Sequence, residues 1–474
     1  MNPRSVRLAV PPAVLRQLAV ADPQRYPALL ESAVAGPLGR LTILAAQPQA
    51  ALWAAADGRV HGRGVTPRAG TFLEALEIWW RESAVAGDQD AAAQRAADPA
   101  VPFAPGWVVF LGYETAAEIE PHLRLPPTPL PWRAFALRTP CALVHVLADD
   151  SVWAVAEPVA ADLLDAVVAD AERLARSAAA DAASGATDPG ELAFQVSEED
   201  PARYIERVLR AKEYIRAGDI YQANLSRPWQ VVPAAAPGSP AHARALAPAL
   251  LYERLRRRNP APFAALLQWQ GVSVLSSSPE RLLRVHGREV DTRPIAGTRP
   301  RTLRPGEDAP EAAALVAHPK ERAEHIMLID LERNDLGRVC EAGTVIVNEL
   351  MVTETYAHVH HIVSNVQGRL RRGVTPIGAL RAVFPGGTIT GCPKFRCMQI
   401  IAELEGAGRG AFYGSLGYLT TGGAMDLNIL IRTMTVERGR ITLRTGGGIV
   451  ADSDPQRELN ETRAKARGML AVFE

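Results

Sequence analysis

Short apolar runs recur through the first 155 residues, and their length and composition predict β-strands. Proline-dense connectors such as RLPPTPLPW separate these runs. The runs occupy residues 41–46, 107–113, 142–147 and 152–156. This part of the chain therefore predicts an α+β arrangement, and it carries no evident chemistry.

A long helical pattern follows these strands. Residues 161–183 are rich in alanine and periodic in the manner of a helix. The stretch DAASGATDPG after them has the Ser, Gly, Asp and Pro content of an exposed linker. We therefore predict three regions, namely an N-terminal α+β domain over residues 1–155, a helix and linker over 156–195, and a second, larger domain over 196–474.

The second domain shows both kinds of periodicity. ARYIERVLRAKEYIRAGD places apolar residues at helical spacing and ends at Gly218, which predicts a helix. Strands are predicted at 220–232, 263–269, 271–276, 343–350, 414–419, 425–436 and 440–443, and helices near 245–258, 310–336, 375–382, 393–404 and 455–472. Because strict βαβ alternation is missing, we expect an α+β fold with a large mixed or antiparallel β-sheet and flanking helices, not a Rossmann sheet.

Composition narrows the class of protein. Lys plus Arg and Asp plus Glu each number 52, so the 474-residue chain has a formal net charge of zero and lacks the electrostatic footprint of nonspecific nucleic-acid or membrane binding. The four cysteines form no CxxC pair, which argues against a disulfide framework or a structural zinc site. The chain shows neither a signal peptide nor an apolar run of about 18 residues. We expect a cytoplasmic protein that binds neither nucleic acid nor membrane.

Two pairs of glutamates stand at helical spacing. Glu321 and Glu324 lie in KERAEHIMLIDLERND, whose apolar run predicts a helix that is buried nearly all round. Near the C-terminus, Glu458, Glu461 and Lys465 share one helix face. Either pair alone is typical of a solvated, salt-bridged surface. Together they favour an oxygen-ligand site for Mg²⁺, which binds a couple of carboxylates plus waters and substrate oxygens.

Two glycine-bearing turns precede predicted helices. FPGGTITGCPK contains two adjacent glycines, and RTGGGIVADSDP contains Gly446, Gly447 and Gly448. Such turns expose backbone N–H groups that suit a carboxylate or phosphate, although glycines also simply permit tight turns. Arg432 lies in the predicted apolar strand LNILIRTMTV and needs an anionic partner from the protein or a ligand. These residues predict a pocket for a small polyanion without identifying it.

Eight segments then show a family resemblance: GDIYQANLS, SSSPERL, PIAGTRPR, KERAEHIMLIDLERND, HHIVS, FPGGTITGCPK, YGSLGYL and GGGIVADSDPQRELNET. They resemble the chorismate-utilising enzymes, in particular aminodeoxychorismate synthase and anthranilate synthase component I. The resemblance covers about residues 196–472, and YPALLES and GRLTIL extend it weakly into the N-terminal part. It implies an α+β fold whose β-sheets and flanking helices enclose chorismate, with Mg²⁺ required, and it makes residues 196–474 the chorismate-binding catalytic domain.

The resemblance also implies roles for the residues that match the family motifs. The direct Mg²⁺ ligands would be Glu324 and Glu461, and Glu321 and Glu458 would support them through water. The substrate carboxylates would be held by Thr388, Tyr413, Arg432 and the amides of Gly446, Gly447 and Gly448, and Lys465 would help to balance the glutamate cluster. Glu280 would be the general acid near the departing C4 hydroxyl. His361 would lie against the ring and its enolpyruvyl side chain.

The PIAGT segment, residues 294–298, departs from many aminodeoxychorismate synthases, which resemble PIKGT there. Their lysine attacks C2 of chorismate, whereas Ala296 cannot act as a nucleophile. Alanine instead resembles the anthranilate synthase motif, in which ammonia itself adds at C2. We count Ala296 and Thr298 among the catalytic positions and expect a noncovalent route through 2-amino-2-deoxyisochorismate.

Further segments help to distinguish a resemblance to aminodeoxychorismate synthase from a resemblance to anthranilate synthase component I. NPAPFAALL, SSSPER, the doubled histidine and FPGG resemble aminodeoxychorismate synthase, whereas PIAGT and ETYAHVHHIVSNV resemble anthranilate synthase. We favour the former, with anthranilate synthase component I as the alternative and a noncatalytic chorismate-binding scaffold as a second alternative. Isochorismate and salicylate synthases fit less well, because relatives of that kind carry a lysine base where this chain has YQANLS.

A partner and a regulator are the last implications of the resemblance. Nothing in the chain resembles the reactive-cysteine motif of a glutamine amidotransferase, so a separate subunit would supply the ammonia. YPALLES, which includes Leu30, Glu31 and Ser32, matches the place where relatives bind tryptophan. A plain turn and strand start explains the same residues equally well.

Overall fold

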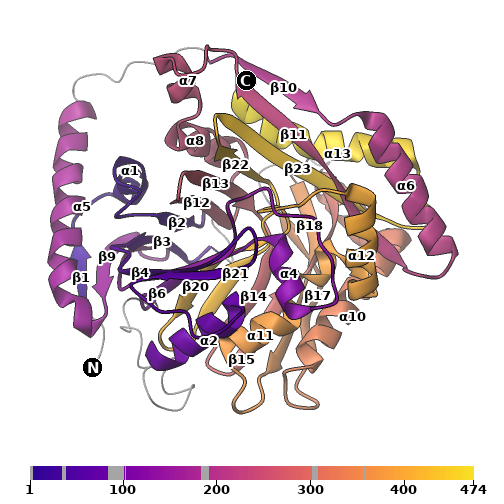
Figure 1. Cartoon of the computed structure of the whole chain (residues 1–474), viewed down its shortest axis with the longest axis horizontal. Helices are drawn as coiled ribbons and strands as arrows, with labels where there is room; N and C mark the ends of the chain where they lie inside the picture. Colours follow the sequence, from indigo (N-terminus) through magenta and orange to yellow (C-terminus); the bar gives the residue numbers. More distant parts are fainter. Residues whose placement is uncertain are drawn as a thin grey trace.

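The computed structural model describes residues 4–34, 39–83, 101, 103–182, 192–301, 308–355 and 359–474. These residues form two large antiparallel β-sheets with flanking helices (Figure 1). The predicted α+β fold class is confirmed. No helix in the described ranges is both long enough and apolar enough to cross a membrane.

The strands of the two sheets are as follows, each in spatial order. The first sheet contains β1 (Arg4–Leu8), β9 (Ser151–Ala156), β8 (Cys141–Val146), β3 (Leu41–Ala46), β2 (Ala28–Glu31), β12 (Phe263–Trp269), β13 (Val272–Ser278), β22 (Thr433–Glu437), β23 (Arg440–Ile449), β11 (Gln222–Pro233) and β10 (Phe194–Glu198), with β19 (Gly391–Cys392) paired to β11. The second contains β16 (Ile295–Pro300), β18 (Val359–Arg369), β15 (Glu289–Arg293), β14 (Arg281–His286), β21 (Met425–Asn428), β20 (Ser415–Thr420), β6 (Gly106–Leu111), β7 (Trp132–Thr139), β4 (Ala50–Ala55) and β5 (Val60–Arg63), with β17 (Ile346–Thr355) paired to β18.

Each sheet has its own set of helices. The first sheet contacts α1 (Ala13–Ala21), α5 (Ala161–Ala182), α6 (Pro201–Arg216), α8 (Pro248–Arg258), α12 (Lys394–Glu405) and α13 (Pro455–Leu470). The second contacts α2 (Phe72–Ser83), α9 (Asp308–Ala317), α10 (Pro319–Gly337) and α11 (Pro376–Val383). The short helices α4 (Ala116–Ile119) and α7 (Pro240–Ala245) and the 3₁₀ turn η3 (Gly387–Ile389) lie in connections. In Figure 1, α5 lies at the left edge of the molecule and α10, α12 and α6 lie on the right.

Strands from both ends of the chain share each sheet. In the first sheet β2 pairs with β12, with Leu30 opposite Ala265. In the second sheet β6 pairs with β20, with Phe110 opposite Leu416. A cluster of buried side chains, which includes Trp132 and Val274, also joins the two ends of the chain. The predicted boundaries at residues 155 and 196 therefore do not divide one sheet from the other, and the division into domains stays a prediction.

Helix ends follow local chemistry. The predicted helix after the linker is α6, at whose start the Asp200 side chain accepts from the N–H of Ala202. Gly218 follows this helix with φ +81°. The predicted single helix at 310–336 is wrong, because α9 and α10 are separate helices. Pro319 begins α10, and a proline disfavours helical geometry in the residue before it, here His318. The prediction that this helix is buried nearly all round is also wrong, since Ile326 is 46% exposed.

The predicted strand at 425–436 is also wrong, because its two halves belong to different sheets. β21 ends at Asn428 in the second sheet, and β22 begins at Thr433 in the first. The chain turns between them at Arg432, which has φ +49°. An uninterrupted apolar pattern cannot reveal this crossing, since both halves are buried. The crossing takes Arg432 out of a strand and places it where the two sheets meet.

Candidate functional site

The residues proposed from sequence come from elements that hydrogen bonds join into one connected region. Arg432, between β21 and β22, contacts His361 on β18. Thr388 in η3 contacts Glu280, which lies between β13 and β14. The side-chain amide of Asn224 on β11 donates to the backbone carbonyl oxygen of Thr388 as well. The tertiary structure therefore gathers residues from Asn224 to Arg432, which lie far apart in the chain.

Glu280 is a buried carboxyl group. Its side chain is 4% exposed, and the Thr388 hydroxyl donates to its Oε1 at 2.9 Å. Burial, with the charge of Glu332 adding to it, raises the pKa of Glu280 to about 8 against the opposing effects of the Thr388 hydroxyl and Arg432. At neutral pH this carboxyl therefore mostly carries its proton, as a general acid requires.

His361 is a neutral ring held by two hydrogen bonds. Its Nδ1 lies 3.4 Å from the carbonyl oxygen of Gly297, and because a carbonyl only accepts, Nδ1 donates. Its Nε2 then accepts from Nη2 of Arg432 at 3.3 Å. Burial and the Arg432 charge lower the pKa of His361 to about 3. The ring therefore presents one fixed tautomer and no charge near neutral pH.

Tyr413 lies beside a short chain of polar contacts. Its hydroxyl donates to Asn224 Oδ1 at 2.6 Å, and Asn224 Nδ2 donates to the carbonyl oxygen of Thr388 at 3.2 Å. Burial raises the pKa of the Tyr413 phenol, so it stays a neutral donor. Tyr413 has φ +63°, and its backbone N–H donates to Leu430 at 2.9 Å. The strained backbone conformation fixes the direction in which the phenol points.

The C-terminal helix brings two carboxylates and an ammonium group to the glycine strand β23. Seen from the position that a Cβ on Gly447 would occupy, Glu458 Oε2 lies at 3.5 Å, Glu461 Oε1 at 3.7 Å and Lys465 Nζ at 3.8 Å. Lys465 Nζ also pairs with Glu461 at 2.8 Å and donates to the carbonyl oxygen of Gly446 at 2.9 Å. The predicted shared face of α13 thus points at the predicted glycine triplet.

The other glutamate pair reaches the same strand less directly. Nε2 of Gln222 lies 3.4 Å from Glu324 Oε1, and it also lies 1.9 Å from where a Cβ on Gly448 would be. Only glycine at position 448 leaves room for this amide. Glu321 lies further along α10, with its Oε2 2.9 Å from the Cβ position of Gly297. Glu324 therefore faces β11 and β23, whereas Glu321 faces β16.

These carboxylates suit a hard divalent cation. The described part of the chain contains no cluster of three or more His, Cys, Asp or Glu side chains arranged to hold a metal. Even so, Glu324 and Glu461 approach the glycine strand from two helices. Oε1 of the 2%-exposed Gln222 has no hydrogen-bond partner among the residues that the structure describes. Mg²⁺ binds a few protein carboxylates and completes its shell with waters and substrate oxygens. The donor set fits Mg²⁺, and its identity as the metal site stays a proposal.

The PIAGT segment forms β16 and carries an irregularity beside His361. Ala296 is 7% exposed and pairs with Ile362. Gly297 has φ +70°, and the register of β16 against β18 shifts between positions 296 and 298. This shift lets the Gly297 carbonyl accept from the His361 ring. Thr298 lies on the strand, but its side chain lies outside the described residues.

One buried carboxyl group of the region was missed by sequence reasoning. Glu332 lies on α10, is 3% exposed, and has a pKa raised to about 7 by burial and by the neighbouring charge of Asp335. Asp335 itself forms an ion pair with Lys394. Its position in the sequence could have indicated it, since Glu332 follows the apolar run in the same helical segment as Glu321 and Glu324. Helical spacing instead drew attention to the Glu321–Glu324 pair.

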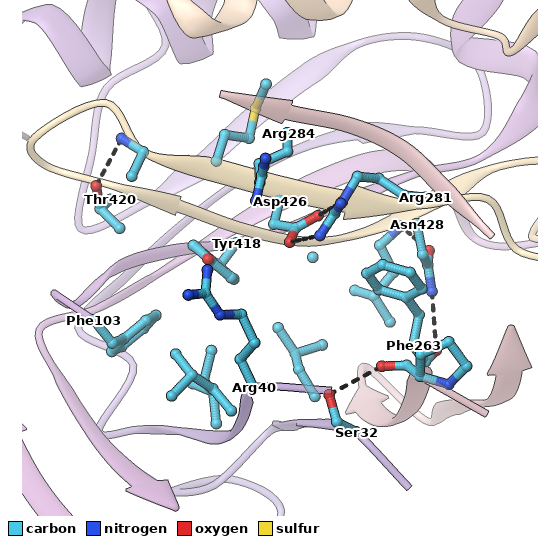
Figure 2. Close-up of a pocket in the computed structure, with 18 of the residues that line it drawn as sticks. Ser32, Arg40, Phe103, Phe263, Arg281, Arg284, Tyr418, Thr420, Asp426 and Asn428 are labelled. Atoms are coloured by element: carbon cyan, nitrogen blue, oxygen red, sulfur yellow. Dashed lines mark hydrogen bonds and ion pairs between the residues drawn. The ribbon is translucent and has the colours of Figure 1, made fainter. Parts of the chain in front are cut away.

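A separate cavity of about 430 Å³ contains the predicted tryptophan-site residues Leu30, Glu31 and Ser32 in its wall. Ser32 Oγ donates to the carbonyl oxygen of Pro262 at 3.1 Å (Figure 2). The Glu31 carboxylate is engaged elsewhere, since it accepts hydrogen bonds from three side chains, those of Arg16, Tyr252 and Arg256. The three predicted residues thus line one cavity, and their role in binding tryptophan stays a proposal.

The charged wall of this cavity is built from the second sheet. Arg281 donates to both carboxylate oxygens of Asp426, at 2.9 and 3.0 Å. Figure 2 shows this pair above the cavity and the Arg40 side chain reaching toward Tyr418. Arg281, the first residue of β14, lines the cavity, and the residue before it, Glu280, belongs to the candidate active site. The two sites are therefore adjacent at the start of β14.

Residues 35–471 match the family described as chorismate binding enzyme. Anthranilate synthase component 1 of Streptomyces coelicolor is 43% identical over 384 residues, which are 78% of this chain and 73% of that relative. The aminodeoxychorismate synthase of Streptomyces griseus is 38% identical over 466 residues, which are 93% of this chain and 59% of that relative. The solved structure of anthranilate synthase component I from Streptococcus pneumoniae has a TM-score of 0.74 and 28% identity, and the match covers 92% of this chain and 93% of that one.

Proposed function

Because the chain belongs to the chorismate binding enzyme family, within the group of anthranilate and aminodeoxychorismate synthases, we propose that it is the synthase subunit of an aminodeoxychorismate synthase. It would convert chorismate and ammonia to 4-amino-4-deoxychorismate, the precursor of 4-aminobenzoate in folate biosynthesis. The similarity to the Streptomyces griseus synthase over 93% of the chain carries this choice of product. The motifs NPAPFAALL, SSSPER and FPGG favour it as well.

Glu280 would begin the chemistry by giving its proton to the C4 hydroxyl of chorismate, which leaves as water while ammonia forms a bond to C2. Its raised pKa supports this role, since a carboxyl that is protonated near neutral pH can act as an acid there. A second ammonia would then form a bond to C4 as the C2–N bond breaks. This noncovalent route follows from Ala296, which has no nucleophile to offer.

Other residues of the chain would bind and orient the substrate. Arg432, Tyr413 and Thr388, with the amides of Gly446, Gly447 and Gly448, would hold the carboxylates, and Lys465 would balance the glutamates. The neutral His361 ring would pack against the substrate ring without adding charge. Glu324 and Glu461 would hold Mg²⁺, supported by Glu321 and Glu458, and the bound ion would neutralise one substrate carboxylate.

Anthranilate synthase is the second candidate, and one observation favours it. Ala296 on β16 resembles the motif of that enzyme, and the sequence of β16, IAGTRP, contains no lysine. In that case the same first amination would be followed by loss of pyruvate, which gives anthranilate. Glu280 would serve the first step in both reactions, so its geometry does not discriminate between them.

Product analysis decides between these reactions. Purified protein is incubated with chorismate, Mg²⁺ and ammonium at alkaline pH, with and without an added aminodeoxychorismate lyase. The proposal expects 4-aminobenzoate only when the lyase is present, whereas anthranilate and pyruvate without the lyase would overturn it. Chorismate that binds without being consumed would indicate a noncatalytic scaffold. Glu280→Gln is the matched control, and we expect it to lower kcat by about 10²- to 10⁴-fold.

A separate glutamine amidotransferase subunit is proposed as the source of ammonia. Burial raises the thiol pKa of all four cysteines, to about 12 for Cys141 and Cys397 and about 11 for Cys340. An activated nucleophilic cysteine has instead a lowered pKa. We therefore expect the isolated chain to use ammonium but not glutamine, and glutamine-dependent turnover by this chain alone would contradict the proposal.

Tryptophan is proposed as the occupant of the cavity around Leu30 and Ser32. Apolar side chains such as Ile43 and Phe263 could pack against an indole ring, and Arg40 could pair with the carboxylate. Isothermal titration should show heat of binding that Arg40→Ala weakens and the exposed-site control Arg59→Ala leaves unchanged. No heat at millimolar tryptophan would remove this proposal.

A further inference from the structure

α10 carries a buried carboxyl group that the proposed reaction leaves unused. Glu332 is 3% exposed, and within the described residues its Oε2 has no hydrogen-bond partner. An unsatisfied buried carboxyl oxygen costs stability, because it has given up its contacts with water. A group of this kind next to a proposed catalytic acid is a candidate for a functional role.

Glu332 and Glu280 contact neighbouring residues of one turn. Glu332 Oε1 lies 3.3 Å from the Cβ position of Gly387, and the adjacent Thr388 donates to Glu280 Oε1 at 2.9 Å. A side chain at position 387 would also approach Leu331 Cβ to 3.1 Å, so glycine there lets the turn pack tightly on α10. The two carboxyl groups therefore approach the Gly387–Thr388 turn from different elements.

The charges around this pair are of both signs. Asp335 lies one helical turn beyond Glu332, and its carboxylate is paired with Lys394. Burial and Asp335 raise the pKa of Glu332 to about 7, whereas Lys394, the Thr292 hydroxyl and the Gly387 N–H act to lower it.

Glu280 has its own set of neighbours. Arg432 lowers its pKa, and Tyr413 faces it as a neutral phenol. The Glu332 charge acts in the other direction and raises it. A negative charge on Glu332 therefore opposes the ionisation of Glu280.

We propose that Glu332 is a positioning residue that holds the Gly387–Thr388 turn against α10 and helps Glu280 to keep its proton. The first role is mechanical, because the turn carries the hydroxyl that orients the Glu280 carboxyl. The second is electrostatic, because a negative charge on Glu332 disfavours loss of the Glu280 proton. The catalytic consequence rests on the proposed function, in which Glu280 is the acid, but it does not depend on which carbon receives nitrogen.

The test is to measure kcat against pH for the variant Glu332→Gln. The amide keeps the shape of the side chain and an oxygen that can accept from the Gly387 N–H, but it cannot carry the charge. We expect the alkaline limb of the kcat profile for ammonium-dependent chorismate consumption to move down by roughly one pH unit. At pH values below that limb, kcat should stay within about two-fold of the wild-type value. Asp330→Asn is the matched control, since this carboxylate on the same helix is exposed and paired with Arg333.

A purely structural role would give a different result. It would lower kcat by the same factor at every pH and leave the limb where it was, and this outcome would overturn the proposal. Glu332→Ala should combine both effects, with a shifted limb and a raised KM, because it also releases the turn. Glu332→Asp should restore part of the wild-type limb, because it restores the charge.

A second measurement does not require turnover. The infrared band of the protonated Glu280 carboxyl is identified by its absence in Glu280→Gln. The intensity of this band is then measured against pH in the wild type and in Glu332→Gln. We expect it to disappear at lower pH in Glu332→Gln, and an unchanged titration would contradict the inference. If the wild type consumes no chorismate but this band still shifts, the proposed function fails and the coupling of the two carboxyl groups stands.

Discussion

Three buried side chains of the candidate site hold protonation states set by their surroundings. Glu280 keeps its proton, His361 stays neutral, and Tyr413 stays a phenol, and in each of them burial is the largest cause. The effect is opposite in sign for acids and for histidine, because burial always disfavours the charged form. The site therefore offers neutral groups to a dianionic substrate, and positive charge comes from Arg432 and Lys465.

Glycine 448 gives a residue-scale prediction. A Cβ there would lie 1.9 Å from Gln222 Nε2, so Gly448→Ala must displace the amide that contacts Glu324. We expect the variant to fold but to need at least about tenfold more Mg²⁺ for half-maximal activity, because a proposed ligand loses its orientation. A titration of activity against Mg²⁺ checks this. Gly468→Ala is the control and should leave the titration unchanged, because this position on α13 is exposed and, among the described residues outside its own helix backbone, a Cβ there would meet no atom within 4 Å.

At the scale of elements, a buried charge network ties α12 to the first sheet. Glu405 is fully buried and accepts from Arg409 at 2.6 Å, from Arg444 of β23 at 2.8 Å and from the Ser226 backbone of β11 at 2.8 Å. Burial alone would raise its pKa, but the two guanidinium charges lower it to about 2. β11 and β23 also carry Asn224 and the glycine triplet Gly446–Gly448, so this network holds in place two strands that form part of the candidate site.

Removing that carboxylate should destabilise the fold. Glu405→Ala leaves two buried guanidinium groups without their shared partner, and we expect a loss of about 3–5 kcal/mol in the free energy of unfolding. Urea denaturation measures it, and Glu403→Ala on the exposed side of α12 should change stability by less than about 0.5 kcal/mol. A similar small change for both variants would show that the network contributes little.

The same network gives a pH dependence with a definite sign. The pKa of Glu405 is lower in the folded chain than in the unfolded chain, so its contribution is present at neutral pH and is lost as pH falls toward about 2. The acid-induced loss of stability should therefore be smaller in Glu405→Ala than in the wild type. Urea midpoints at a series of acidic pH values test this expectation.

At the scale of the molecule, the two sheets are built jointly by the two ends of the chain. β2 pairs with β12 and β3, and β20 pairs with β6 and β21. A chain that began at residue 196 would leave one edge of β12 and one edge of β20 without partners. It would also lack Trp132 and Phe135, so the buried side chains that pack in the same cluster, such as Val274 and Leu416, would become exposed. The predicted domain boundary therefore should not be a folding boundary.

Expression of residues 196–474 alone tests this point. We expect aggregation or the absence of a cooperative urea transition, because a large part of each sheet is missing. The full chain is the control and should unfold cooperatively. A truncated chain with a sharp transition and bound chorismate would instead support an independent C-terminal domain.

The sequence by itself determined the fold class, many of the helices and the list of candidate site residues. Helical spacing placed Glu458, Glu461 and Lys465 on one face, and Gly218 marked where the helix α6 ends. These features are local, since they depend on residues within one or two turns of each other. The family motifs extended them to the named candidates for catalysis and binding.

Features that depend on contacts between residues far apart in the chain were decided only by the tertiary structure. The crossing of the chain between sheets at Arg432, the sharing of both sheets by the two ends, and the packing of Glu332 on the turn beside Glu280 leave no local pattern. The protonation of Glu280 and His361 belongs to the same class, because burial and the charges of Glu332 and Arg432 arise only when separate elements pack. Local periodicity encodes which face of an element is buried, but it does not encode which other element covers that face.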